Sequence, residues 1–197
     1  MPVVDAHVHL FPPDVITCRD DYCARDDWFG VTHSTFPIER FPQVETLLAS
    51  MDMAGVDVAV VAAWPWRDQG ICRLHNDFLA EICAREPRLA WLGIVNPGQP
   101  GAVEELERAR RLGASGIGEL NADAQGFAWE DEGALREVAE IATTLDFPLM
   151  AHVSEPVGHD YPGKGTATPP RILAFVEQHP TYGWSRRTGA EGCPFTS

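Results

Sequence analysis

The chain has 197 residues, 45% of them hydrophobic, and its 29 acidic and 15 basic residues give a formal net charge of −14. This composition is typical of a folded globular protein, and its acidity argues against nucleic-acid binding, which requires a basic surface to contact phosphates. The sequence has no run of roughly 20 apolar residues to span a bilayer and no basic signal-peptide start. We therefore expect a cytoplasmic protein without a nucleic-acid or membrane partner, and the composition indicates no particular oligomeric state.

The cysteines do not follow a disulfide or metal-binding pattern. They are odd in number and irregularly spaced, and no two make a Cys-x-x-Cys pair: Cys18, Cys23, Cys72, Cys83 and Cys193. Cys72 and Cys83 lie among apolar residues, where thiols are most often buried. We expect neither a disulfide framework nor a cysteine-only zinc site.

In the first third of the chain, short apolar runs alternate with helical patterns. Val3–Val8 predicts a strand, and the polar, proline- and aromatic-rich stretch Phe11–Pro42 is too long for an ordinary connection and predicts a lid over a site. Val44–Met53 predicts a helix that Gly55 ends. Val56–Ala63 is a nearly unbroken apolar run, as expected of a strand buried on both faces.

The same alternation continues to residue 180. Asn76 predicts the N-cap of a helix through Arg85, which Pro87 terminates. The remaining expected elements are a strand at Leu89–Val95, a helix marked by Ala102, Leu106 and Ala109 with Gly113 after its end, a strand at Gly116–Leu120, a helix striped from Leu135 to Leu145, a strand at Pro148–Val153, and a helix that Thr168 opens before Pro180.

Five strand-helix units in alternation indicate a parallel sheet with crossover helices. A (β/α)₈ barrel takes eight such units and about 250 residues, so this chain stops roughly three units short. A doubly wound open sheet accommodates five strands without a deficit. Alternation alone leaves both architectures open.

Polar side chains stand where three of these strands end. His7 and His9 are two residues apart on the first strand and so share one face, and His152 ends the fifth strand. Parallel folds place their sites at such strand ends, and catalytic zinc commonly takes three protein ligands and a water. The sequence therefore predicts a divalent-metal site, with Zn²⁺ as the expected ion. Glu119, at the end of the fourth strand, is a further ligand, a partner behind the ligands, or a loop carboxylate facing solvent.

These segments resemble the amidohydrolase-related metal-dependent hydrolases, a family of TIM barrels that includes hydrolases and non-oxidative decarboxylases. The resemblance rests on Val4-Asp5-Ala6-His7-Val8-His9-Leu10-Phe11, on Gly113–Leu120, on Pro148–His152 and on the loop from Glu155 to Gly165. It runs from Val4 to about Pro180. It implies an α/β fold, a partial (β/α)₈ TIM barrel covering about the first five units, with His7, His9 and His152 as metal ligands.

The resemblance also implies an activity. We expect a metal-dependent hydrolase of an amide, lactone or similar small carbonyl substrate, with a metal-dependent non-oxidative decarboxylase as the alternative and an inactive metal-binding fragment as the second alternative. Tyr161 and Lys164 are candidates for substrate contact. The family also uses a histidine after strand six, within His-x-Gly-Gly, and an aspartate after strand eight, and these 197 residues contain neither.

The last residues do not resemble the family. The codons possible for Thr181 to Ser197 can be read again with the frame moved by two nucleotides. Among the sequences that these codons then allow is Leu-Arg-Val-Val-Ala-Ala-His-Trp-Gly-Gly-Gly-Leu-Pro-Phe-Tyr. That segment reads as a sixth strand followed by the missing histidine motif. We therefore expect residues 1–180 to be the N-terminal portion of the barrel and residues 181–197 to be a frameshifted tail.

Overall fold

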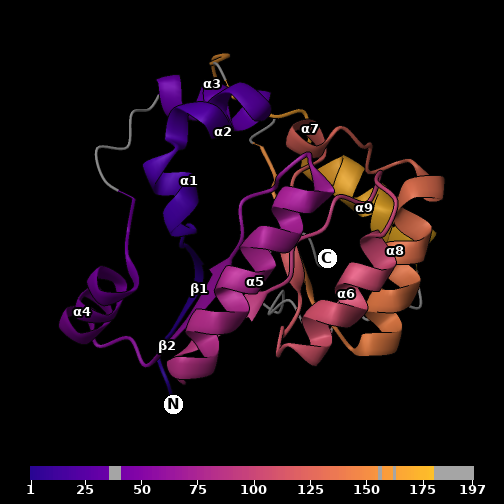
Figure 1. The fold of residues 1–197 in the computed structure, drawn as a ribbon. Coiled ribbons are helices and arrows are strands. Elements are labelled where there is room, and N and C mark those ends of the chain that lie inside the picture. The colour runs from indigo at the N-terminus through magenta and orange to yellow at the C-terminus, as the bar shows by residue number, and fades with distance from the viewer. Residues whose placement is uncertain (36–40, 155–156, 162, 180–197) are drawn as a thin grey trace.

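The computed structural model describes residues 1–35, 41–154, 157–161 and 163–179. Within this part of the chain every strand pairing is parallel, as the alternation predicts (Figure 1). The strands are β1 (Val4–His9), β2 (Val58–Ala62), β3 (Leu89–Leu92), β4 (Ile117–Leu120) and β5 (Leu149–Ala151). The predicted tail, residues 181–197, lies outside the described residues.

The helices connect successive strands. They are α1 (Pro13–Thr17), α2 (Arg19–Arg25), α3 (Asp27–Thr35), α4 (Val44–Ala54), α5 (Gln69–Arg85), α6 (Ala102–Arg111), α7 (Ala122–Gln125), α8 (Glu132–Leu145) and α9 (Pro169–Gln178). In Figure 1, α5, α6 and α8 lie side by side along the strands, whereas α1, α2 and α3 lie beyond the end of β1. Among the described helices, none is both long and apolar enough to cross a bilayer.

The order of the strands decides between the two architectures. β2 pairs with both β1 and β3, and β4 pairs with β5. The amide of Gly93, after β3, donates to the carbonyl of Gly116 at 2.9 Å, and the amide of Gly118 donates to the Gly93 carbonyl at 3.0 Å. The order is therefore β1-β2-β3-β4-β5, without the reversal that defines a doubly wound sheet. Neighbouring strands that follow chain order form the arc of a (β/α)₈ barrel.

Helical periodicity explains how the outer layer packs. On α6 the buried residues are Ala102, Glu105, Leu106 and Ala109, the spacing of one helix face. Gly113 follows this helix with a φ of +101°, a left-handed conformation that favours glycine, so its predicted role after the helix end is confirmed. The last turn of α6 carries three arginines, Arg108, Arg110 and Arg111, whose positive charge is favourable near the partially negative end of a helix.

One sequence-based expectation is wrong. Asn76 does not cap α5: the helix begins seven residues earlier, at Gln69, and Asp68 caps it by accepting from the Ile71 amide at 2.9 Å. Asn76 is instead buried within the helix. The described part of the stretch Phe11–Pro42 folds into α1, α2 and α3, and its role as a lid over a site stays a prediction.

Those three helices cover a layer of aromatic rings. Trp66 contacts Tyr22 of α2 and Phe29 of α3 at ring-centroid distances of 5.8 and 4.9 Å. We call the rings that pack together here the aromatic cluster: Phe11, Phe29, His33, Phe41, Trp64, Trp66 and His75. Because most of these rings are buried, the segment is a packed layer over the carboxyl end of β1.

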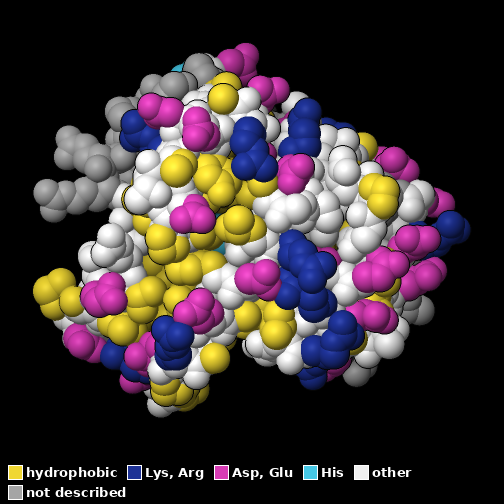
Figure 2. All heavy atoms as spheres, in the orientation of Figure 1, with side chains coloured by type: hydrophobic (Ala, Val, Ile, Leu, Met, Phe, Trp, Pro, Cys, Tyr) yellow, Lys and Arg dark blue, Asp and Glu magenta, His cyan; other side chains and the backbone are white. Residues whose placement is uncertain are grey.

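Elsewhere, some apolar side chains remain at the surface. Val3, Val4 and Met53 are 52%, 50% and 85% exposed, near the start of β1 and at the end of α4. Figure 2 shows hydrophobic side chains gathered on the face between α4 and α5. The described cysteines are unpaired, and Cys72 is buried as expected, whereas Cys83 is only partly buried.

Candidate metal centre

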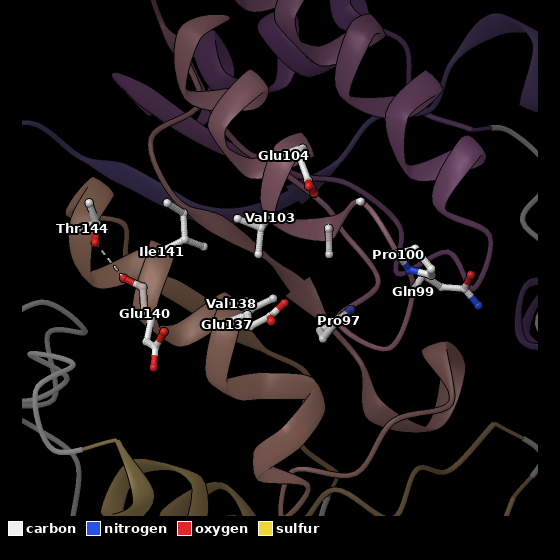
Figure 3. Close-up of a pocket in the computed structure, with 12 residues that line it drawn as sticks. Pro97, Gln99, Pro100, Val103, Glu104, Glu137, Val138, Glu140, Ile141 and Thr144 are labelled. Atoms are coloured by element: carbon white, nitrogen blue, oxygen red, sulfur yellow. Dashed lines mark hydrogen bonds between the residues drawn. The ribbon is translucent and has the colours of Figure 1, made fainter.

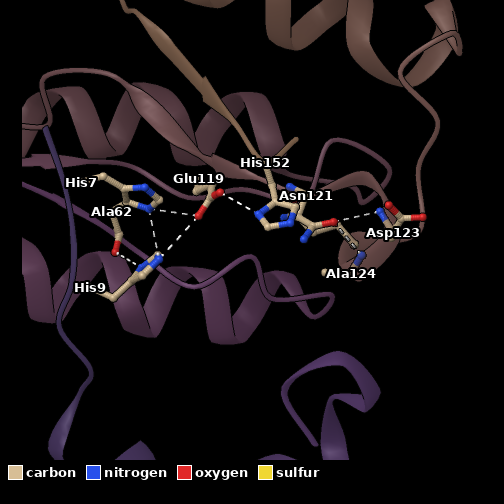
Figure 4. A network of polar contacts seen from close by, with 9 residues as sticks. His7, His9, Ala62, Glu119, Asn121, Asp123, Ala124 and His152 are labelled. Carbon is tan, nitrogen blue, oxygen red and sulfur yellow. Dashed lines mark hydrogen bonds and ion pairs between the residues drawn. The ribbon is translucent and has the colours of Figure 1, made fainter. Parts of the chain in front are cut away.

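The fold brings the polar residues of three strand ends together (Figure 4). His7 and His9 lie on the carboxyl half of β1, and Glu119 lies on β4. His152 directly follows β5, whose last residue is Ala151. Because the strands are parallel, all four side chains stand at the same end of the arc, as the sequence predicts.

Three of these residues converge at one point. The Nε2 atom of His7 lies 3.1 Å from Nε2 of His9 and 3.1 Å from Oε2 of Glu119. Nε2 of His9 lies 3.5 Å from the same carboxylate oxygen. The ligand atoms of His7, His9 and Glu119 all lie within 4.8 Å of one another, and we call this group the metal cluster.

The protonation of His9 suits metal binding. Its Nδ1 lies 2.9 Å from the carbonyl oxygen of Ala62, which can only accept. Nδ1 therefore carries the hydrogen, and Nε2 presents its lone pair to the cluster. A ligating histidine is commonly oriented through its other nitrogen in this way. Two imidazole nitrogens and one carboxylate oxygen form a donor set that fits a divalent cation such as Zn²⁺ or Mn²⁺.

His152 reaches this cluster through Glu119. Its Nδ1 lies 2.9 Å from Oε1 of Glu119, the carboxylate oxygen that His7 and His9 do not share. Glu119 thus stands between the first-strand histidines and the fifth-strand histidine. The assignment of His152 as a third histidine ligand stays a prediction.

Burial and hydrogen bonding act in opposite directions on Glu119. The residue is 7% exposed, so the interpretation of Glu119 as a solvent-facing carboxylate is wrong. Burial alone raises the pKa of a carboxyl group, but the hydrogen bonds from His152 and His7 outweigh it and lower the pKa of Glu119 below its ordinary value. The Glu119 hydrogen bond raises the pKa of His7. The carboxylate is therefore ionised, as a metal ligand must be.

The two candidate substrate contacts lie in the loop after β5. Nζ of Lys164 donates to the carbonyl of His159 at 3.3 Å and lies 3.7 Å from a carboxylate oxygen of Asp160. The ring of Tyr161 contacts the ring of His159, with centroids 6.0 Å apart. Both of these Lys164 contacts lie within its own loop, and its role toward a substrate stays a prediction.

Hydrogen bonds connect the segment after this loop to the helix that follows β4. The amide and hydroxyl of Thr166 each donate to the carboxylate of Asp123 at 2.7 Å. Asp123 belongs to α7, whose N-cap residue Asn121 accepts from two amides of that helix. Arg171 of α9 donates to the Thr166 hydroxyl at 2.8 Å. The segments after β4 and β5 are thereby held together at the rim of the site.

Sequence reasoning missed the Ala62 carbonyl, which holds His9. No residue-type signal marks such a group, because every residue has a carbonyl. Its position follows only from the pairing of His9 with Ala62 between β1 and β2.

A separate pocket of about 500 Å³ lies on the outer layer between α6 and α8 (Figure 3). Its lining includes Val103, Val138 and Ile141 beside the acidic Glu137 and Glu140. None of its lining residues belongs to the metal cluster. The site at the strand ends is therefore distinct from this surface pocket.

The sequence model of the amidohydrolase family matches residues 4–184. The chain belongs to the amidohydrolase family. The match spans all of β1 to β5 and the residues of the metal cluster. Among curated proteins, this amidohydrolase is 26% identical over 172 residues to a gamma-resorcylate decarboxylase of Rhizobium radiobacter, covering 77% of this chain and 50% of that protein.

Solved structures share the fold of this amidohydrolase. A 5-carboxyvanillate decarboxylase from Sphingomonas paucimobilis superposes with a TM-score of 0.73 at 20% identity, covering 91% of this chain and 65% of that one. A variant 5-carboxyvanillate decarboxylase from Novosphingobium aromaticivorans, with bound manganese and 3-methoxy-4-hydroxy-5-nitrobenzoic acid, gives 0.64 at 21% identity, covering 92% and 56%. The chain thus spans between half and two thirds of the length of these three proteins.

Proposed function

We propose that the chain carries the first-strand and fourth-strand half of the metal centre of a decarboxylase that acts on an aromatic acid. The observation that carries the proposal is the convergence of His7, His9 and Glu119 on one point at the strand ends. The choice of decarboxylation is supported by relatives named for it, the gamma-resorcylate and 5-carboxyvanillate decarboxylases. Manganese in one of these structures makes Mn²⁺ a candidate beside Zn²⁺.

Hydrolysis of an amide or lactone, the activity first expected from the sequence, is the competing proposal. The family resemblance implies a divalent metal for both reactions, so the metal cluster alone supports hydrolysis and decarboxylation equally. The difference lies in the second substrate: hydrolysis consumes water, whereas decarboxylation consumes a proton and releases CO₂. The names of the relatives favour decarboxylation.

In decarboxylation the aromatic carbon that bears the carboxylate takes up a proton, and its bond to the carboxyl carbon breaks to release CO₂. A bound divalent cation supplies positive charge that holds the substrate's anionic oxygens. The chain's own residues supply ligand atoms and fix their orientation. His7 and His9 offer their Nε2 atoms, the Ala62 carbonyl keeps His9 in one tautomer, and Glu119 contributes a fixed negative charge.

Titration of the purified chain with Mn²⁺ or Zn²⁺ by isothermal calorimetry tests the metal centre. We expect one ion per chain, with affinity lowered at least tenfold by His7→Ala and by Glu119→Gln, because each removes one ligand atom. His159→Ala is the matched control, since His159 is exposed and lies outside the metal cluster. Equal binding by His7→Ala and the wild type would falsify the metal centre.

Release of CO₂ tests the reaction. Two metal-loaded proteins are compared: the 197-residue chain, and the protein that the gene encodes when the predicted frameshift is reversed. Each protein is supplied with dihydroxybenzoic acids and, in a separate assay, with an aromatic lactone. We expect CO₂ and the decarboxylated phenol from the longer product. Ring-opened lactone without CO₂ supports the hydrolase instead.

A further inference from the structure

A buried histidine stands behind the end of β1 and is no part of the metal cluster. His75, in the middle of α5, is completely buried. The indole N–H of Trp66 donates to Nδ1 of His75 at 2.9 Å. Because Nδ1 accepts this bond, the hydrogen of the neutral ring is on Nε2, which donates to the carbonyl oxygen of Leu10 at 2.8 Å.

The carbonyl that His75 binds directly follows a metal-cluster residue. Leu10 is the next residue after His9, and the last pairing of β1 with β2 joins His9 to Ala62. Leu10 therefore lies just beyond the strand ladder. The strand end is held on two sides, by the Ala62 carbonyl bound to the His9 ring and by the His75 ring bound to the Leu10 carbonyl.

An apolar residue at position 75 would fill the space but leave two buried polar groups without this partner. Burial of an unpaired N–H or carbonyl costs about 1–3 kcal/mol, so the peptide after His9 would gain by turning away from its present orientation. Phe11 and Phe78 pack against the His75 ring, with centroids 5.8 and 6.2 Å away, and hold it in place. The ring is thus a fixed donor aimed at one carbonyl.

We propose that His75 is a positioning residue of the metal centre, which acts by holding the Leu10 carbonyl and thereby the orientation of His9. Trp66 selects the tautomer that makes His75 a donor. Through its rings, Trp66 also connects this relay to Phe29 and Tyr22, which belong to the helices over the site. The inference rests on the proposed metal centre, but its effect on His9 is present without metal.

The experiment compares one chemical change at two buried histidines of the aromatic cluster. His75→Phe removes both hydrogen bonds, whereas His33→Phe is the control, because His33 has no hydrogen-bond partner in the described structure. His75→Gln is the rescue variant, since its side-chain amide can again donate to the Leu10 carbonyl and accept from Trp66. Trp66→Phe keeps an aromatic ring and removes only the N–H donor.

The first measurement is metal-free. Nitrogen-15 NMR of labelled histidines reports the tautomer of His9, and we expect a single Nδ1–H form in the wild type, in His33→Phe and in His75→Gln. In His75→Phe we expect a mixture of the two tautomers, because the strand end is released. A single His9 tautomer in folded His75→Phe overturns the proposal. If that variant does not fold, the same criterion applies to Trp66→Phe.

The second measurement is Mn²⁺ affinity by calorimetry. We expect His75→Phe to bind at least tenfold more weakly and His75→Gln to recover to within threefold of the wild type, with His33→Phe unchanged. Equal losses in His75→Phe and His33→Phe would assign the effect to packing and overturn the proposal. Absence of Mn²⁺ and Zn²⁺ binding in the wild type would reject the metal centre, and the NMR result would still decide the role of His75.

Discussion

Glu119 uses its two carboxylate oxygens for different partners. Oε2 faces His7 and His9, while Oε1 contacts Nδ1 of His152 at 2.9 Å. In a hydrogen bond to a carboxylate, this Nδ1 carries the hydrogen, which leaves Nε2 of His152 to act as a ligand. The same hydrogen bond also fixes the plane of the carboxylate, so the predicted ligand role of His152 is separable from its hydrogen bond to Glu119.

Two substitutions of His152 distinguish these roles. We expect both His152→Ala and His152→Gln to lower Mn²⁺ or Zn²⁺ affinity at least tenfold, because both remove a ligand nitrogen. Glutamine can still donate a hydrogen bond to Glu119. Calorimetry measures the metal affinity of both variants. If His152→Gln retains the wild-type affinity while His152→Ala loses it, the ligand assignment is contradicted and His152 is left as the residue that orients Glu119.

His33 differs from His75 in having no partner. It is 6% exposed, neither ring nitrogen has a hydrogen-bond partner in the described structure, and burial lowers its pKa to about 4. We expect His33→Phe to raise the free energy of unfolding by about 1 kcal/mol, because it removes buried polar atoms and keeps the edge contact with Phe29. Urea unfolding at pH 7 measures the change. A loss of stability would mean that the larger ring does not fit.

At the scale of elements, the side chain of Asn76 joins α5 to the segment that follows β3. The amide of Asn76 donates to the Ile94 carbonyl at 2.9 Å and accepts from the Ile94 amide at 2.8 Å. It also donates to a carboxylate oxygen of buried Glu105 on α6 at 2.8 Å. One residue thus connects a strand end and two helices of the outer layer.

Removal of this side chain takes the partner from the Ile94 amide and carbonyl, whereas Glu105 keeps its hydrogen bonds from Arg108. We expect Asn76→Ala to lower the free energy of unfolding by about 3 kcal/mol, because each buried group that loses its partner costs about 1–3 kcal/mol and water partly compensates. Arg73→Ala, on the exposed face of the same helix, is expected to change it by less than about 0.5 kcal/mol. Equal effects in urea unfolding would contradict this account of Asn76.

The same residue shows where sequence reasoning stops. Asp68 and Asn76 are both chemically suitable N-caps, and local pattern cannot tell that Asn76 is buried against Ile94, 18 residues away and just beyond β3. His7, His9 and His152 were identified because strand direction places them at one end. The burial of Glu119 could not be predicted in this way, because it depends on contacts with His7 and His152, which are distant in sequence.

For the molecule as a whole, the buried histidines predict a stability that falls in acid. Burial lowers the pKa of His75 from 6.5 to about 3. Between these values the unfolded chain binds a proton that the folded chain does not, so the free energy of unfolding rises with pH. The low pKa of Glu119 acts in the same direction below its ordinary value.

We expect His75 alone to account for about 2 kcal/mol of stability lost between pH 7 and pH 5. Urea unfolding at several pH values measures the slope for the wild type and for His75→Gln. The variant is expected to show the shallower slope whatever its stability at pH 7. Equal slopes would contradict a buried, neutral His75.

The predicted frameshift is tested on the gene. DNA sequencing across codons 178–197 and several hundred bases beyond is expected to find that the shifted frame stays open. It should encode the His-Trp-Gly-Gly-Gly segment and a later aspartate at a strand end. A stop codon soon after the shift point would contradict the prediction and favour the metal-binding fragment.

The order of strands in the arc also governs when the site is completed during synthesis. β1, β2 and β3 find all their mutual pairing partners within the first 92 residues. Translation adds about 5–20 residues per second, and N-terminal segments generally fold first. We therefore expect His7 and His9 to take their places before Glu119 emerges from the ribosome, and nascent chains arrested once β3 has emerged to resist protease there. Emergence of β4 from the ribosome then supplies the carboxylate that closes the metal cluster.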